Sequence, residues 1–160
     1  MWWLVGVVGV IVLVATYLTW TASRVDRLHT RAATSARALD AHLVRRAAAA
    51  AVLAEEAAIP DLYAAARSAL DADPDEREAA ENDLTRQLRK ISLSAEDPAT
   101  AGVVGASRRV GLTRQVHNDM VRDALAVRRR PLVRLLGLTR RHPRPAYFDV
   151  DDPTLDPPSG

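Results

Sequence analysis

The distribution of apolar and polar side chains changes sharply near residue 20. The first twenty residues, MWWLVGVVGVIVLVATYLTW, contain no charged side chain. A helix of about 20 apolar residues is long enough to cross the hydrocarbon core of a bilayer, which is roughly 30 Å thick. Aromatic side chains, which favour the membrane–water interface, stand near both ends of this stretch: Trp2, Trp3, Tyr17 and Trp20. We therefore predict a transmembrane anchor over residues 1–21.

The charges beside this stretch predict its orientation. Arg24 and Arg27 follow the apolar residues, and no Lys or Arg precedes them. Since basic residues stay on the cytoplasmic side, we predict a single-pass protein with its N-terminus outside and the remainder in the cytoplasm. A cleaved signal peptide and a buried helix of a soluble protein are the alternatives. The stretch lacks the basic start and the A-x-A site of a signal peptide, which favours the anchor.

The rest of the chain has the periodicity of helices. No helix breaker interrupts residues 21–58, and apolar positions recur there at three- and four-residue steps. Further helices are predicted over 60–72, from Asp73 with Pro74 to about residue 93, and from Asp97 with Pro98 to about Arg130. These features predict an all-α protein, in which the anchor helix continues into an antiparallel bundle of about four helices over residues 22–138.

The C-terminal segment has a different composition. Residues 139–160 are rich in Pro and end with several acidic residues. Such a composition is typical of extended chain, and we predict a partly disordered tail there.

Charge is arranged in blocks along the chain. Net charge is +4 over residues 1–53, −7 over 54–100, +9 over 101–145 and −4 over 146–160. Neighbouring helices of opposite charge attract one another, whereas a nucleic-acid-binding surface would be uniformly basic. Because the charges alternate in sign along the chain, we expect no nucleic-acid partner.

The chain has no Cys, which excludes disulfides and thiol catalysis.

Four stretches, in order and spacing, resemble the LemA family of bacterial membrane proteins. They are LDAHLVRRA at 39–47, AENDLTRQLRKI at 80–91, TRQVHNDMVRDA at 113–124, and LVRLLGL at 132–138 followed by YFDVDD. The resemblance covers about residues 21–152 and the anchor. It implies a transmembrane helix followed by a long antiparallel bundle in the bacterial cytoplasmic membrane, and it implies no enzyme activity. It marks these positions: Arg45, Arg46, Arg114, Asn118 and Val121.

The chain also departs from the pattern of that family. AAAAVLA at 48–54 replaces a stretch that contains Pro and Asn, His117 replaces a Tyr, and Arg130 precedes Pro131 in place of a Phe. A ligand bound by the missing turn would not be bound here.

The paired arginines have two interpretations. Arg45 and Arg46 lie on a helix whose inward face includes Leu39 and Leu43, so one of the pair points sideways or inward. The favoured interpretation is an ion pair with an acid of the third helix, Glu78, Glu81 or Asp83. The alternative is a basic pocket, built with Arg114 and Asn118, that binds a small anion or a protein partner.

The titratable residues match no catalytic or metal motif. The histidines, at positions 29, 42, 117 and 142, lack metal-ligand spacing, although His42 and His117 could face each other. Asp119 and Asp123 could pair, but nearby Arg residues favour a solvated face. We therefore predict no catalysis, no cofactor and no metal.

An Arg-rich segment follows the last long helix. Residues 127–144 carry seven Arg and no acid, interleaved with Leu and Val. We predict two alternatives: a segment lying on an anionic membrane surface, or a cap on the end of the bundle with solvated arginines. The candidate lipid contacts are Arg128, Arg129, Arg130 and Arg134. The whole pattern predicts a membrane scaffold or interaction module that binds an unknown protein or itself, or else a tethered receptor for an anionic ligand or lipid headgroup.

Overall fold

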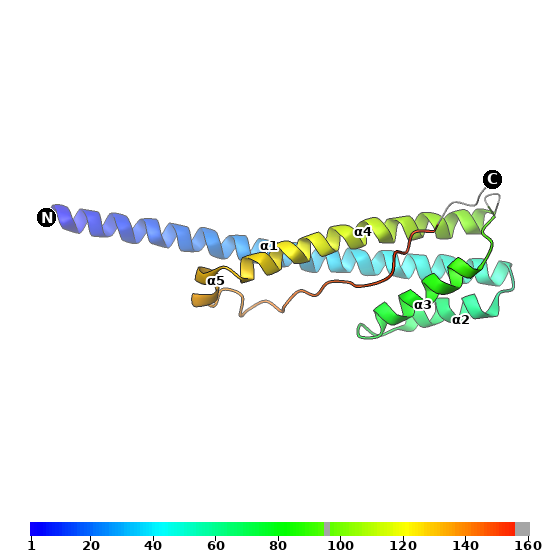
Figure 1. Cartoon of the computed structure of the whole chain (residues 1–160). Helices are drawn as coiled ribbons and strands as arrows, with labels where there is room; N and C mark the ends of the chain where they lie inside the picture. Colours follow the sequence, from blue (N-terminus) through cyan, green and yellow to red (C-terminus); the bar gives the residue numbers. More distant parts are fainter. Residues whose placement is uncertain (95–96, 156–160) are drawn as a thin grey trace. The chain divides into compact units, whose positions relative to one another are not determined.

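The computed structural model describes residues 1–94 and 97–155, and within these residues the protein is all-α (Figure 1). Its helices are α1 (Trp2–Glu56), α2 (Pro60–Asp71), α3 (Arg77–Lys90), α4 (Pro98–Arg128) and α5 (Pro131–Leu135). The chain divides into two compact units. Unit 1 comprises Met1–Thr34 and Asp119–Ala146, and unit 2 comprises Ser35–Asn118 and Tyr147–Gly160. The predicted all-α fold class is confirmed.

The helix boundaries follow the prolines and the caps. α1 continues from the apolar stretch to Glu56 without a break, as predicted. Pro60 and Pro131 occupy the first turns of α2 and α5, where the missing N–H is not needed. Asp97 caps α4, because its carboxylate accepts hydrogen bonds from the backbone N–H groups of Ala99 and Thr100.

The predicted start of the third helix is wrong. Asp73 does not cap a helix that begins at Pro74, because its carbonyl accepts the N–H of Glu76 and closes a turn. α3 begins only at Arg77, with no side-chain cap, and it ends at Lys90 rather than near residue 93.

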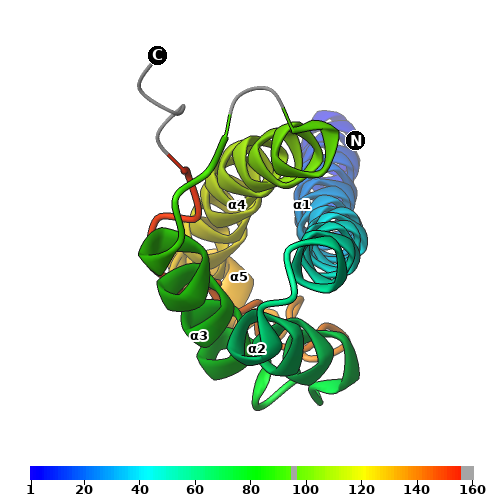
Figure 2. The ribbon, with the colours of Figure 1, turned by 90° about the vertical axis from the view of Figure 1, so that its right-hand side faces the viewer.

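Unit 2 contains the larger core. Figure 2 shows α4, α1, α2 and α3 in that order around the unit, with α3 returning to the side of α4. Contacts of α1 residues 35 and 46 with α4 residues 117 and 107 make these two helices antiparallel. Apolar residues of α1, α2, α3 and α4, most of them alanines and leucines, form one cluster, which includes Ala47, Ala50, Leu62, Leu84, Leu88 and Val103. The main core of unit 2 is therefore built by close packing of Ala-rich helices, in a chain where only 4% of the residues are aromatic.

Unit 1 contains a much smaller core. Its buried apolar residues are Val25, Val127 and Val133, with Leu28 and Leu138 packed against them. The short helix α5 turns back after Pro131 and places Val133 in this cluster. Gly137, with a φ of 61°, allows the chain to leave α5. The apolar residues of α1 before Tyr17 are exposed.

The chain beyond residue 146 is extended. Tyr147–Leu155 contains no helix, and Phe148, Val150, Pro153 and Leu155 turn toward the protein. This segment lies between α3 and α4 (Figures 1 and 2). Partial disorder of the tail stays a prediction, and residues 156–160 lie outside the described part.

Candidate functional site

The N-terminal part of α1 is a helix long and apolar enough to cross a membrane. Only 6% of its most apolar 18-residue window is buried. The predicted interfacial aromatics are exposed, from 94% for Trp2 to 49% for Tyr17. The guanidinium carbon of Arg24 lies 5.6 Å from the ring centroid of Trp20, within the range of a cation–π contact. The last aromatic side chain of the apolar stretch, Trp20, therefore contacts the first basic side chain after it, Arg24.

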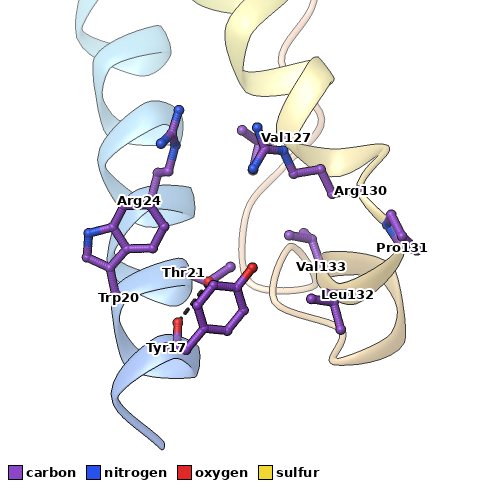
Figure 3. Close-up of a pocket in the computed structure, with 9 residues that line it drawn as sticks. All are labelled: Tyr17, Trp20, Thr21, Arg24, Val127, Arg130, Pro131, Leu132 and Val133. Carbon is purple, nitrogen blue, oxygen red and sulfur yellow. Dashed lines mark hydrogen bonds between the residues drawn. The ribbon is translucent and has the colours of Figure 1, made fainter. Parts of the chain in front are cut away.

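A cavity of about 160 Å³ opens in unit 1 beside these residues. α1 contributes Tyr17, Trp20, Thr21 and Arg24, and the opposite wall is Val127, Arg130, Pro131, Leu132 and Val133. Figure 3 shows the side chain of Arg130 extending across the cavity toward α1. The cavity thus combines an apolar lining with two guanidinium groups, Arg24 and Arg130. Of the four arginines predicted to contact lipid, Arg130 is the one that lines it.

Arg128 has a different environment from its neighbours. Its Nη1 donates to His29 Nε2 (3.1 Å) and to the carbonyl of His142 (3.2 Å). The Nδ1 of His29 donates to the carbonyl of Val25, so a neutral imidazole with its proton on Nδ1 satisfies both contacts. Burial is the main cause that lowers the pKa of His29, opposed by its bond to Val25. Arg128 is therefore engaged inside unit 1, whereas Arg129 and Arg134 are exposed.

His29 and His142 also contact each other. Their rings are stacked with centroids 4.7 Å apart, and His142 Nε2 lies 2.8 Å from Asp26 Oδ1. The described residues contain no group of three or more potential metal ligands of the His, Cys, Asp and Glu types. His117 hydrogen-bonds to Ser35. The polar contacts of these histidines link helices and loops.

Arg46 is the centre of a buried polar cluster in unit 2. Its side chain and that of Glu81 are each 1% exposed, and Nη1 of the arginine donates to Oε2 of the carboxylate (2.9 Å). Its Nε donates to Ser107 Oγ (3.1 Å), and its Nη2 donates to Thr85 Oγ1 (2.8 Å). One arginine thus connects α1, α3 and α4. The predicted ion pair with the third helix is confirmed for Arg46 and Glu81, while Arg45 is exposed.

Burial and the attraction between opposite charges act in opposite directions on the Arg46–Glu81 pair. Burial raises the pKa of Glu81, and the charge of Arg46 opposes this shift. The second carboxylate oxygen of Glu81, Oε1, is buried and has no hydrogen-bond partner among the described residues. A buried ion pair stabilises only when its polar atoms are satisfied, so much of the attraction here offsets the removal of both charges from water.

Arg114 and Asn118 bind the backbone of the C-terminal segment. The amide nitrogen of Asn118 donates to the carbonyl of Phe148 (3.2 Å), and its amide oxygen accepts the N–H of the same residue (3.0 Å). Arg114 donates to the carbonyl of Val150. Arg46 and Arg114 therefore engage separate partners, and the contacts of Arg46 are with Glu81, Ser107 and Thr85.

Residues of α3 bind the same segment from the other side. Glu78 accepts the N–H of Asp149 (2.9 Å), and Asn82 accepts the N–H of Asp151 (2.8 Å). Arg89 donates to the carbonyl of Asp152 (2.7 Å). The pKa of the Asp152 carboxyl is lowered, mainly by hydrogen bonds from Thr154 and further by the charges of Arg114 and Arg89.

Sequence reasoning missed several of these residues. Thr85 and Ser107 could have been found, because each lies three or four residues from buried apolar positions of its own helix, such as Leu88 and Val110. Asn82 and Arg89 gave no such signal, since polar residues on a helix surface are ordinary. Their role depends on a segment more than sixty residues away in sequence.

Comparison of the chain with known protein families, with curated proteins and with solved structures found no match.

Proposed function

We propose that this chain is a membrane-anchored, non-catalytic interaction module of the LemA type at the bacterial cytoplasmic membrane. The observation that carries the proposal is that one helix, α1, joins an exposed apolar stretch to a packed helical unit. Exposed apolar surface is unfavourable in water by about 25 cal/mol per Å², and a bilayer removes this penalty.

The proposed orientation places the N-terminus outside and the helical units in the cytoplasm. Arg24, Arg27 and Arg31 follow the apolar stretch on α1. Basic residues close to the end of a membrane span determine its orientation more than distant charges do.

The buried polar groups of unit 2 support a non-catalytic role. The guanidinium of Arg46 is enclosed by Glu81, Thr85 and Ser107, and its exposed fraction is 1%. An arginine that takes part in catalysis or binds a ligand would need guanidinium N–H groups that a substrate can reach. Here the guanidinium links three helices, which is a structural use of the charge.

Single-cysteine labelling of the full chain tests both the span and its orientation, because the chain has no Cys of its own. Cysteine at the exposed Trp2 should react with a membrane-impermeant maleimide in intact cells, and cysteine at the exposed Arg45 should react only after the membrane is opened. Carbonate washing should leave the protein in the membrane. Labelling of Arg45→Cys in intact cells, or release by carbonate, would overturn the proposal.

A matched substitution tests the anchor itself. Val8→Asp should prevent stable insertion, since an acidic residue at the centre of a span is unfavourable by about 2.5–3.5 kcal/mol, whereas Val8→Leu should insert normally. Equal membrane retention of the two variants would count against a span.

A second candidate function is recognition of an anionic lipid headgroup, and it is favoured by the cavity in unit 1. Trp20, whose side chain suits the lipid–water interface, lines that cavity together with Arg24 and Arg130. The two guanidinium groups could bind a phosphate while Tyr17 and Leu132 contact the glycerol and acyl chains.

Native mass spectrometry of the full chain in mixed phosphatidylglycerol and phosphatidylcholine nanodiscs tests this second candidate. Phosphatidylglycerol should be retained, and Arg24→Gln with Arg130→Gln should reduce retention. Arg129→Gln with Arg134→Gln, which removes the same charge from exposed positions outside the cavity, is the matched control. Equal losses in the two double variants would show only a general charge effect.

A further inference from the structure

The C-terminal segment is bound mainly through its backbone. Six of its backbone polar groups bond to side chains of α3 and α4: the N–H groups of residues 148, 149 and 151, and the carbonyls of residues 148, 150 and 152. Five side chains supply these bonds: Glu78, Asn82 and Arg89 of α3, and Arg114 and Asn118 of α4. Backbone groups are present in every polypeptide, so this arrangement recognises an extended chain with little demand on its sequence.

The spacing of the binding side chains matches an extended chain. Glu78 and Asn82 are four residues apart on α3, and they bind residues 149 and 151. Asn118 and Arg114 are four residues apart on α4, and they bind residues 148 and 150. Four residues of an α-helix rise about 6 Å, and two residues of extended chain span about 6.6 Å. One helical turn therefore corresponds to one two-residue repeat of the segment.

The direction of the segment follows from the same bonds. Residue numbers rise along α3 from 78 to 89 as they rise along the segment from 149 to 152, so the two run parallel. Residue numbers fall along α4 from 118 to 114 as the segment advances, so those two run antiparallel. We call the surface formed by Glu78, Asn82, Arg89, Arg114 and Asn118 the backbone-binding groove.

Apolar side chains and charge add selectivity. Val150 and Leu155 are 6% and 4% exposed, and Phe148 packs against the cluster of Leu39, Leu43 and Val110. On the outer side Asp149, Asp151 and Asp152 are exposed, in a segment bound by two arginines of the groove. The groove therefore fits an extended acidic segment with apolar residues at alternate positions.

Most of the buried apolar side chains of unit 2 belong to its helices. The helix cores of unit 2 are built from residues of α1, α2, α3 and α4, with Leu155 as the one contribution of the segment to the main cluster. Backbone-directed bonds at the edge of a protein exchange readily with those of another extended chain, because each bond is individually weak. An attached segment competes at a high effective concentration, so a partner must bind more tightly than the segment or be concentrated nearby.

We infer that the backbone-binding groove is a docking site for an extended acidic segment of a partner protein, and that residues 147–155 occupy it as a built-in competitor. This inference deepens the proposed interaction function by naming the class of partner. It rests on unit 2 alone and is tested in detergent, so its failure would leave the membrane proposal intact, and failure of the anchor tests would leave the groove intact.

The test uses the full chain and a fluorescent synthetic peptide, AYFDVDDPTLD, which copies residues 146–156. In one variant, Asp149→Pro with Asp151→Pro removes the two N–H groups that Glu78 and Asn82 accept and so weakens the attached segment. In its matched control, Asp149→Ala with Asp151→Ala keeps both N–H groups. Fluorescence anisotropy should show at least about tenfold tighter peptide binding to the proline variant than to the alanine control.

The specificity of binding is tested on both partners. Asn118→Ala, added to the proline variant, should weaken peptide binding about tenfold, because it removes both bonds to residue 148. Two altered peptides are also tested on the Asp149→Pro, Asp151→Pro protein without the Asn118 change. The peptide with proline at the positions of residues 149 and 151 should bind poorly, whereas the peptide with alanine at these two positions should bind. The peptide comparison leaves the protein fold untouched. Equal binding of the two peptides, or no binding to the proline variant, would overturn the inference.

Discussion

Unit 1 and unit 2 each contain a buried or half-buried arginine that links helices, but the two arginines have different partners. In unit 2, Arg46 is paired with the carboxylate of Glu81 inside a large apolar cluster. In unit 1, Arg128 binds a neutral histidine and backbone carbonyls beside a core of three buried valines. A charged partner holds the arginine at any pH where the carboxylate is ionised, whereas a histidine holds it only while unprotonated. We therefore expect different substitutions and different pH changes to destabilise the two units.

Loss of the carboxylate in unit 2 should have the largest effect. Glu81→Ala leaves the charge of Arg46 buried without a partner, and the free energy of unfolding should fall by about 3–5 kcal/mol. Replacement of both, Arg46→Met with Glu81→Leu, should recover most of this loss, because neither charge remains in the core. Urea unfolding followed by circular dichroism measures both variants.

Arg45→Met is the control for the arginine change, since Arg45 is exposed beside Arg46. It should alter stability by less than about 0.5 kcal/mol. A Glu81→Ala variant as stable as the control would show that the buried pair contributes nothing and would remove the contrast between the units.

Mild acid should weaken unit 1 before unit 2. Because the pKa of His29 is lowered below its usual value of 6.5, the folded protein binds this proton less well than the unfolded chain does. Its contribution is present above pH 6.5 and is lost as the pH falls through the lowered pKa. Hydrogen exchange at residues 119–128 should therefore speed up, relative to the intrinsic rates, between pH 7.5 and 5.5.

His29→Gln should reduce this pH dependence, since the amide does not titrate. The groups around His29 are Arg128, His142 and Asp26, and the contact of His142 Nε2 with the carboxylate of Asp26 is kept in this variant. The same pH response in His29→Gln would show that it does not come from His29 and would contradict the prediction.

Stronger acid should act on unit 2 through Asp97, with the smallest effect of the three. Hydrogen bonds from Thr100 lower the pKa of Asp97 below its usual value of 3.8, so its cap stabilises α4 above that pH and is lost as the pH falls through the lowered value. The melting temperature should fall through Asp97 at a lower pH than through His29. Asp97→Asn keeps a capping oxygen but does not titrate, so this fall at low pH should disappear in that variant.

Local signals were enough to predict the boundaries of most helices. Pro60, Asp97 with Pro98, and Pro131 each act on the backbone of the residues next to them, and the structure places helix boundaries there. The third helix shows the limit of such signals. Asp73 and Pro74 form a sequence that suits both a helix start and a turn, and the carbonyl of Asp73 accepts the N–H of Glu76 to form the turn.

The candidate residues were predicted only in part. The sequence indicated that Arg45 or Arg46 pairs with the third helix, and the steps from Leu39 and Leu43 place Arg46 on the buried face. It did not indicate that Arg114 and Asn118 bind backbone atoms, because the partner residues are in a segment whose composition is typical of disorder. Bonds between residues thirty or more positions apart leave no local pattern.

By itself, the sequence determined the helical class, the long uninterrupted α1 and its exposed apolar stretch, because periodicity, prolines and uncharged length act over neighbouring residues. Only the tertiary structure decided which arginine is buried, which histidine accepts a hydrogen bond from Arg128, and where the C-terminal segment lies. Those outcomes depend on which side chains from distant parts of the chain meet when the helices pack. The backbone-binding groove is one example. Its side chains, spaced about one helical turn apart, match every second residue of the extended segment, and they do so only after α3 and α4 are brought together.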